Sequence, residues 1–200
     1  MEPDARSDAI IVKRSIPINV PNTLTLLRIL LTPLFAIFLI KHLFGFALLV
    51  FAIATVSDAM DGLVARLFHQ KTTLGAYLDP AADKLLLTTA FVTLAIQELI
   101  PSWLAVIVIT RDILILFGIA LFIITAREFQ PVPSILSKIT TVAQLTSVLS
   151  VLLAYQAPRI AQVQEPLFWF AAGMTMVSGF QYIYRGLNIL QEEGNLGSNL

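Results

Sequence analysis

The sequence predicts an all-α integral membrane protein with six transmembrane helices. Its 200 residues are 57% hydrophobic and 13% charged, with a mean hydropathy of +0.83, whereas soluble domains are roughly 45–50% apolar. Six apolar runs follow one another along the chain, and polar or proline-containing breaks separate them. Each run is close to the roughly 20 residues that a helix needs to cross about 30 Å of hydrocarbon.

The breaks locate the individual spans. Asn22 or Thr23 can cap the first helix, the pairs Lys41-His42 and Gln97-Glu98 end two apolar runs, and Pro101 opens another. We expect spans at 24–40, 44–66, 78–96, 103–125, 136–155 and 166–187.

The chain divides into three predicted segments. Residues 1–20 form an N-terminal cytoplasmic segment that lies at the membrane interface, with Lys13 and Arg14 near anionic headgroups. Residues 21–188 form one six-helix domain, and residues 189–200 form a disordered C-terminal tail. Trp103 and Trp169 are near span ends, as expected of an aromatic belt.

The basic residues predict the orientation. With six spans, both termini lie on the same side of the membrane as the 67–77 loop. That side carries most of the basic residues, whereas the opposite loops carry only Lys41 and Arg159. Because basic loops stay in the cytoplasm, we expect both termini there: Arg6, Lys13, Arg14, Arg66, Lys71, Arg127, Lys138 and Arg185 lie on that side.

Four aspartates are concentrated around the loop between the second and third spans. Asp58 and Asp61 share one face of a helix with Gly62 and Ala65, because the spacing is i, i+3, i+4 and i+7. Gly75, Asp79 and Asp83 are four residues apart and share a face of the next helix. We expect the two carboxylate pairs to converge.

Converging carboxylates predict a divalent cation site. Carboxylates repel each other unless cations lie between them, and hard oxygen ligands suit magnesium, manganese or calcium. A charge near the middle of a membrane helix costs about 2.5–3.5 kcal/mol on insertion scales, so four aspartates need a function. Four solvated aspartates around a polar loop are the alternative. The glycines disfavour it, because they let a ligand approach the backbone.

These residues resemble the signature of the CDP-alcohol phosphatidyltransferase family. The matching pattern is Asp58-x-x-Asp61-Gly62-x-x-Ala65-Arg66, then eight residues, then Gly75-x-x-x-Asp79-x-x-x-Asp83. The resemblance implies a membrane enzyme that transfers a phosphatidyl group from CDP-diacylglycerol to an alcohol and releases CMP. It also implies magnesium or manganese, in two ions, and a homodimer.

The resemblance assigns a role to each motif position. Asp58, Asp61, Asp79 and Asp83 are the expected metal ligands, and Asp83 is also the expected general base on the acceptor hydroxyl. The donor nucleotide is expected to contact a further set of motif residues, namely Gly62, Ala65, Arg66 and Gly75. The motif contains no serine, cysteine or histidine, so we expect direct in-line attack without a covalent enzyme intermediate.

Three basic residues inside or near the spans are candidates for binding the acceptor. Arg111 lies within the fourth span, where an ionisable residue is a site hypothesis by default; an internal pair with a carboxylate is the alternative. Lys138 and Arg28 lie near span ends and can bind acceptor phosphate or extend to the interface.

Three further blocks surround the motif: Val20-Pro21-Asn22-x-Leu24-Thr25-x-x-Arg28, Thr110-Arg111-Asp112 and Ser137-Lys138-x-x-Thr141-x-x-Gln144. They resemble the family branch that makes anionic phospholipids, which includes phosphatidylglycerophosphate synthase and a cardiolipin synthase. Glycerol 3-phosphate is the favoured acceptor and phosphatidylglycerol the alternative. The pair Arg111-Asp112, which only apolar residues follow in this span, favours phosphatidylglycerol. We expect a bacterial inner-membrane enzyme with a cytoplasmic active site.

Other classes fit less well. A divalent-cation transporter would need a polar path to the far side, where the loops carry few acidic residues beyond Glu98 and Glu165. A net charge of zero gives no indication of nucleic-acid binding, and the absence of cysteine excludes disulfides and thiolate metal sites.

Overall fold

The computed structural model describes residues 20–68, 73–124 and 135–197, and all of its elements are helical. Within these ranges, side chains at 20–22, 24, 59–68, 73–83, 119–124, 185 and 187–197 lie outside the description. The elements are α1 (Val20–Ile40), α2 (Phe44–Phe68), α3 (Thr73–Ile96), α4 (Ser102–Ile124), α5 (Ile135–Ala154), the 3₁₀ helix η1 (Pro158–Val163) and α6 (Gln164–Gly197).

The predicted apolar runs all form helices, and the largest differences lie at the helix ends. α3 begins at Thr73, five residues before the expected start at Leu78. α6 continues as far as Gly197, so the segment expected to be a disordered tail from residue 189 is helical over most of its length. Sequence analysis did not predict η1. The N-terminal interfacial segment, residues 1–19, lies outside the described residues.

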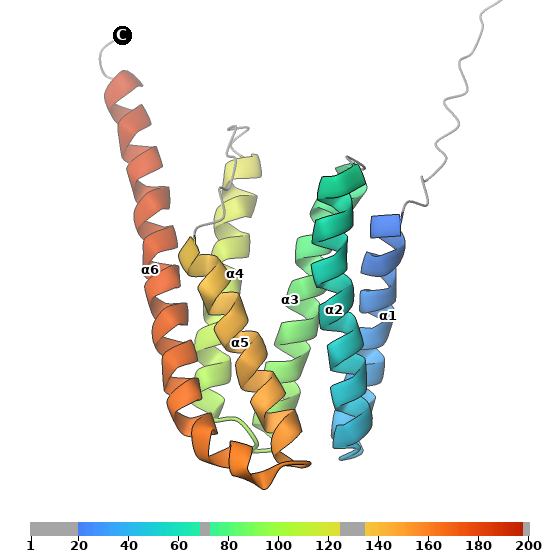
Figure 1. The fold of residues 1–200 in the computed structure, drawn as a ribbon. Helices are drawn as coiled ribbons and strands as arrows, with labels where there is room; N and C mark the ends of the chain where they lie inside the picture. Colours follow the sequence, from blue (N-terminus) through green and yellow to red (C-terminus); the bar gives the residue numbers. More distant parts are fainter. Residues whose placement is uncertain (1–19, 69–72, 125–134, 198–200) are drawn as a thin grey trace, which may run out of the picture.

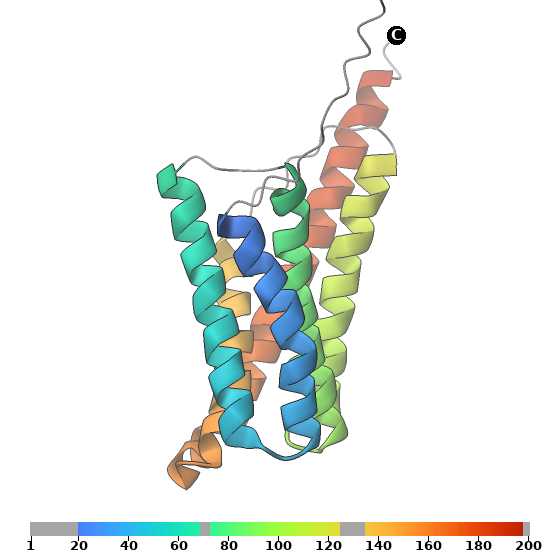
Figure 2. The same ribbon diagram turned by 90° about the vertical axis from the view of Figure 1, so that its right-hand side faces the viewer.

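Two groups of three helices make up the bundle (Figure 1). α1 packs against α2 and α3, while α6 packs against α4 and α5. Contacts of α3 with α4, and of α5 with α2 and α3, join the two groups. α1 begins at the end of the bundle where α6 ends, as both views show (Figures 1 and 2). The turns after α1 and α3, together with η1, lie at the other end.

α1 and α3 end in the same way, although neither uses glycine. His42 has φ of 56° and Glu98 has φ of 59°. The N–H of Leu43 bonds to the carbonyl of Phe38 at 2.8 Å, and that of Leu99 bonds to Leu94 at 2.9 Å. A left-handed residue followed by a backbone hydrogen bond to the carbonyl five residues earlier is the Schellman helix end. It explains why the predicted breaks at 41–42 and 97–98 are sharp.

Many large apolar side chains are exposed on the outside of the bundle, and several polar and charged side chains are buried alongside its apolar core. Leu30, Phe46 and Phe180 are more than half exposed. Buried polar residues line the helix contacts instead: Thr25, Arg28, Arg111, Asp112, Thr140, Gln144, Ser147, Thr175 and Ser178. A soluble domain would bury its large apolar groups and expose its charges. This distribution is what a lipid-facing exterior requires.

The hydropathy of the helices agrees in part with six spans. Among the described residues, Ile135–Ala154 is long and apolar enough to cross a membrane. Three other stretches are apolar but shorter: Thr25–Ile40, Phe44–Asp58 and Lys84–Ile96.

Candidate functional site

The four motif aspartates lie on α2 and α3, on either side of the α2–α3 connection. Asp58 and Asp61 are in the C-terminal half of α2, and Asp79 and Asp83 are in the N-terminal half of α3. α1 packs against both of these helices and therefore couples them. Asp58 is the motif aspartate whose side chain is described. The side chains at the other motif positions lie outside the described residues: Asp61, Gly62, Ala65, Arg66, Gly75, Asp79 and Asp83.

Asp58 forms an ion pair with the buried Arg28. An Nη1 atom of Arg28 lies 2.9 Å from Oδ1 of Asp58, the Arg28 side chain is completely buried, and the Asp58 side chain is 43% exposed. The hydroxyl of Thr32 donates to the Arg28 carbonyl at 2.9 Å. A carboxylate has about four lone-pair sites, so this ion pair leaves acceptor capacity on Asp58. Arg28 contacts a motif aspartate, and binding of the acceptor by Arg28 stays a prediction.

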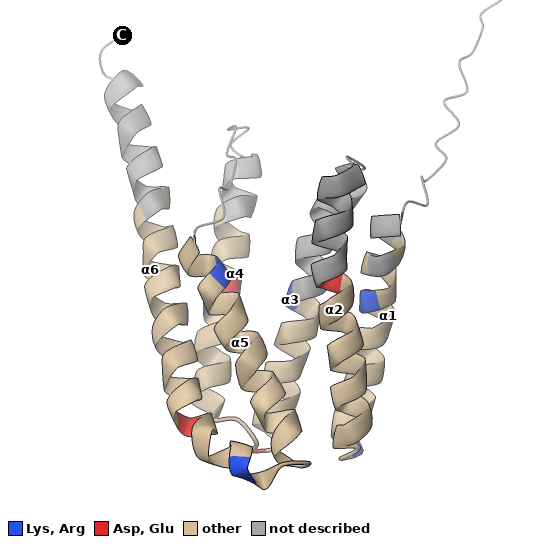
Figure 3. Cartoon of the chain, viewed as in Figure 1, with Lys and Arg blue, Asp and Glu red and all other residues tan. Residues whose placement is uncertain are grey.

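A second polar cluster joins four helices near the middle of the bundle. Arg111 of α4 donates to Oδ1 of Asp112 at 3.0 Å, and to the hydroxyls of Ser137 on α5 and Ser178 on α6, both at 2.9 Å. The ammonium of Lys84, on α3, also bonds to Oδ1 of Asp112. Figure 3 shows charged residues at this level and at the lower loops, with mostly uncharged helix between them.

The charge and the bonding of this cluster indicate what it can bind. Lys84 and Arg111 contribute two positive charges and Asp112 one negative charge, so the three carry a net charge of +1. Nε of Arg111 and Oδ2 of Asp112 are buried without a hydrogen-bond partner among the described residues. Nε of Arg111 is a donor that can bind an anionic group such as a phosphate, whereas Oδ2 of Asp112 is an acceptor and cannot.

Within this cluster Arg111 makes an internal ion pair with a carboxylate. Its bond to Asp112 is the internal pair that sequence analysis held as the alternative, and its bonds to Ser137 and Ser178 tie three helices together. Binding of an acceptor by Arg111 stays a prediction. Lys138 is exposed, and no ion pair or hydrogen bond joins its side chain to another described residue. It follows Ser137 directly, so it lies at the edge of the same cluster.

Ser178 and the seam between α5 and α6 were missed by sequence analysis. Thr140 donates to the carbonyl of Met174 at 3.1 Å, and the Gln144 amide donates to the hydroxyl of Thr175 at 3.2 Å. Thr175 and Ser178 are three residues apart in an apolar span. That spacing places two hydroxyls on one helix face and was the available signal.

A metal site cannot be assembled from the described carboxylates alone. No group of three or more His, Cys, Asp or Glu side chains suited to a metal occurs within the described part of the chain, which contains one of the four motif aspartates. Asp58 by itself fits a hard divalent cation, because its carboxylate is accessible and oriented by Arg28.

Comparison with known proteins identifies the relatives of this chain. Residues 18–177 match the family model described as CDP-alcohol phosphatidyltransferase. The chain is 32% identical over 194 residues to a human protein named cardiolipin synthase (CMP-forming), covering 88% of this chain and 64% of that protein. Thus the chain spans a little under two thirds of the length of this human relative.

Two bacterial relatives have similar levels of identity. The chain is 33% identical over 194 residues to the CDP-diacylglycerol–glycerol-3-phosphate 3-phosphatidyltransferase of Bacillus subtilis, covering 86% of this chain and 97% of that enzyme. It is 32% identical over 164 residues to a Streptomyces coelicolor cardiolipin synthase (CMP-forming), covering 78% of this chain and 75% of the relative. Together with the family match, these similarities confirm the resemblance read from the aspartate motif: the chain belongs to the CDP-alcohol phosphatidyltransferase family.

Proposed function

We propose that this protein is a phospholipid-synthesising enzyme that transfers the phosphatidyl group of CDP-diacylglycerol to a phosphate-bearing alcohol and releases CMP. The observation that carries the proposal is the juxtaposition of two elements. One is the aspartate motif, in which Asp58 is anchored by a buried arginine. The other is the cluster of net charge +1 around Arg111, whose Lys84 directly follows the motif residue Asp83.

The proposed reaction is a direct displacement at phosphorus. The acceptor hydroxyl oxygen forms a bond to the phosphorus that carries diacylglycerol, and the bond from that phosphorus to the CMP oxygen breaks. Asp83 takes the hydroxyl proton. Two magnesium or manganese ions, held by Asp58, Asp61, Asp79 and Asp83, would neutralise the pyrophosphate and stabilise the attacking and leaving oxygens. Arg66 would contact a donor phosphate, while Gly62, Ala65 and Gly75 leave room for the nucleotide.

Glycerol 3-phosphate is the first candidate acceptor. The Bacillus relative named for that acceptor is matched over 97% of its length. The positive charge of the Arg111 cluster suits the acceptor phosphate, with Lys138 at its edge. Phosphatidylglycerol is the second candidate, because the human and Streptomyces relatives are named cardiolipin synthases. It also carries a phosphate that this cluster suits.

The proposed setting is a bacterial inner membrane crossed six times, with both termini and the aspartates on the cytoplasmic side. The apolar exterior of the described helices supports burial in lipid. The common end of α1 and α6 supports an even number of crossings. The bias of basic residues supports the orientation. A homodimer is the assembly expected from the family resemblance.

The deciding experiment offers each acceptor separately to the purified protein. The protein in detergent is mixed with CDP-diacylglycerol, magnesium or manganese, and either glycerol 3-phosphate or phosphatidylglycerol, and both CMP and the lipid product are measured. We expect phosphatidylglycerophosphate from the first reaction. Cardiolipin from the second reaction, with no product from the first, would make phosphatidylglycerol the acceptor. If neither glycerol 3-phosphate nor phosphatidylglycerol supports CMP release, that is, if both reactions are inactive, both candidates are overturned.

Asp83→Asn tests the chemical step. We expect turnover to fall by about 10²–10⁴-fold, the usual contribution of a general base. The control is Glu193→Gln, near the end of α6, which removes one carboxylate that is not part of the motif. Undiminished turnover in Asp83→Asn would remove the base assignment.

A further inference from the structure

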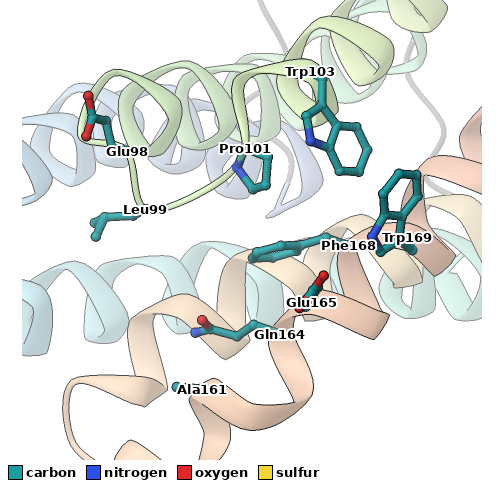
Figure 4. A pocket seen from close by; sticks show the side chains of 9 residues that line it. All are labelled: Glu98, Leu99, Pro101, Trp103, Ala161, Gln164, Glu165, Phe168 and Trp169. Carbon is teal, nitrogen blue, oxygen red and sulfur yellow. The ribbon is translucent and has the colours of Figure 1, made fainter.

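A pocket of about 440 Å³ lies at the end of the bundle opposite the α2–α3 connection. One wall comes from the turn after α3 and the start of α4, and the other from η1 and the start of α6 (Figure 4). Trp103 and Trp169 lie at one end of the pocket, and Glu165 lies between Gln164 and Phe168 on the α6 wall. None of these residues belongs to the proposed transfer site.

The polar side chains of the pocket are mainly hydrogen-bond acceptors. Glu98 and Glu165 line it, and neither carboxylate pairs with a basic side chain among the described residues. The amide nitrogen of Gln164 already donates to the Ser150 carbonyl at 3.2 Å, which leaves the amide oxygen as an acceptor. Among the described residues, no lysine or arginine lines the pocket. Two unpaired carboxylates with an amide oxygen select for a cation.

The aromatic side chains of the pocket indicate which class of cation it would bind. The rings of Trp103 and Trp169 have centroids 4.7 Å apart, and they are 38% and 63% exposed. Phe168, 6% exposed, lies between these rings and Gln164 in the close-up. Among aromatic side chains, tryptophan attracts a cation to its ring face most strongly. An inorganic divalent ion would instead need several oxygen ligands close together.

We propose that this pocket binds an ammonium group, primary or quaternary, with Glu165 as the counter-charge and the tryptophan pair as the aromatic contact. The ligand class is an amine-bearing headgroup or the corresponding free amine. The pocket lies at a membrane-facing end with exposed tryptophans, where lipid headgroups are found. The site is independent of the transferase reaction, so either assignment can fail without the other.

The chain supplies its own reporter for this site. It contains two tryptophans, and both line the pocket. Their fluorescence, excited where tyrosine does not absorb, can be followed in full-length protein in a maltoside detergent that has no amine. The probes are choline, ethanolamine and 3,3-dimethylbutan-1-ol, which has the shape of choline without its charge. We expect saturable changes with the two amines and none with the alcohol at equal ionic strength.

Glu165→Gln is the decisive variant, because it keeps both tryptophans and removes the charge from an exposed position. We expect choline to bind about five- to tenfold more weakly. Glu193→Gln removes the same charge from the other end of α6 and should leave binding unchanged. Equal responses to choline and the alcohol, or unchanged binding in Glu165→Gln with native circular dichroism, would overturn the proposal.

A second comparison separates the two ligand sources. Dihexanoyl phosphatidylethanolamine and dihexanoyl phosphatidylglycerol are titrated below their micelle concentrations. Binding of the ethanolamine lipid at least tenfold tighter than free ethanolamine, with no response to the glycerol lipid, identifies a lipid headgroup site. Equal binding of the lipid and the free amine identifies a small-amine site. A response to the glycerol lipid equal to that of the ethanolamine lipid contradicts ammonium recognition.

Discussion

The guanidinium of Arg28 lies 2.9 Å from the carboxylate of Asp58, and it approaches from the buried side of the bundle. This contact joins α1 to the first aspartate of the motif. α1 carries no motif residue, yet it packs against both helices that do. Arg28 therefore fixes the direction in which Asp58 presents its remaining lone pairs. Positioning of this kind is how residues behind a metal ligand tune a site.

Arg28→Lys distinguishes positioning from acceptor binding. Lysine keeps the charge but lacks the planar guanidinium, so Asp58 loses its orientation. We expect kcat to fall about ten- to hundredfold, the usual effect of a small misplacement, while KM for the acceptor stays the same. Steady-state kinetics with varied acceptor measures both quantities. A rise in the KM for the acceptor at constant kcat would indicate that Arg28 binds the acceptor.

Ser178→Ala tests the link between the Arg111 cluster and the acceptor. The hydroxyl of Ser178 accepts from Nη2 of Arg111 at 2.9 Å, and its loss frees the guanidinium to reorient. We expect the KM for the acceptor to rise about three- to tenfold. A hydrogen bond to a charged group contributes about 1.5–3 kcal/mol, and a water molecule that bonds to the guanidinium in place of Ser178 would recover part of that energy.

Ser147→Ala is the matched control for that measurement. Ser147 is also a buried serine, but its hydroxyl donates to the Ala143 carbonyl of its own helix at 2.8 Å. KM should not change in this variant. Equal changes in KM for Ser147→Ala and Ser178→Ala would show that loosening of the bundle, rather than Arg111, causes the effect.

Asp112→Ala should be among the most destabilising single changes in the described part of the chain. The carboxylate accepts from both Arg111 and Lys84, and the Asp112 side chain is 5% exposed. Its removal leaves a buried guanidinium without its counter-ion, which costs about 3–5 kcal/mol. The free energy of unfolding in a mixed-micelle SDS titration measures this loss. Thr110→Ala, on the exposed side of the same turn, should change it by less than about 0.5 kcal/mol.

His42→Gly should stabilise the protein. His42 has φ of 56° at the end of α1, where a residue with a Cβ is strained and glycine is not. We expect the free energy of unfolding to rise by about 0.5–1 kcal/mol after the extra flexibility of glycine in the unfolded chain is subtracted. Lys41→Gly, one residue earlier at negative φ, should lower it. The same direction of change in both variants would contradict this account.

Local sequence signals predicted the helices, because the apolar runs and the breaks at 41–42 and 97–98 depend on neighbours along the chain. The end of α6 was predicted wrongly, since the polar, glycine-containing segment after Leu190 gives no local helix signal, yet the helix continues to Gly197. The ion pair of Arg28 with Asp58 spans thirty positions and depends on how α1 packs. Charge and position made Arg111 a candidate, but its serine partners come from two other helices. The facing tryptophans were expected as separate members of a belt.

The order of synthesis gives the Arg111 cluster a consequence for biogenesis. A ribosome makes α4 before α5 and α6, so the guanidinium of Arg111 leaves the ribosome before Ser137 and Ser178 do. Asp112 and Lys84 are already present and can accompany it, but the two serine bonds form later. On the proposed six-span topology, we expect α4 to insert less stably until α5 and α6 follow it. A chain truncated before α5 and released from the ribosome should leave α4 incompletely inserted.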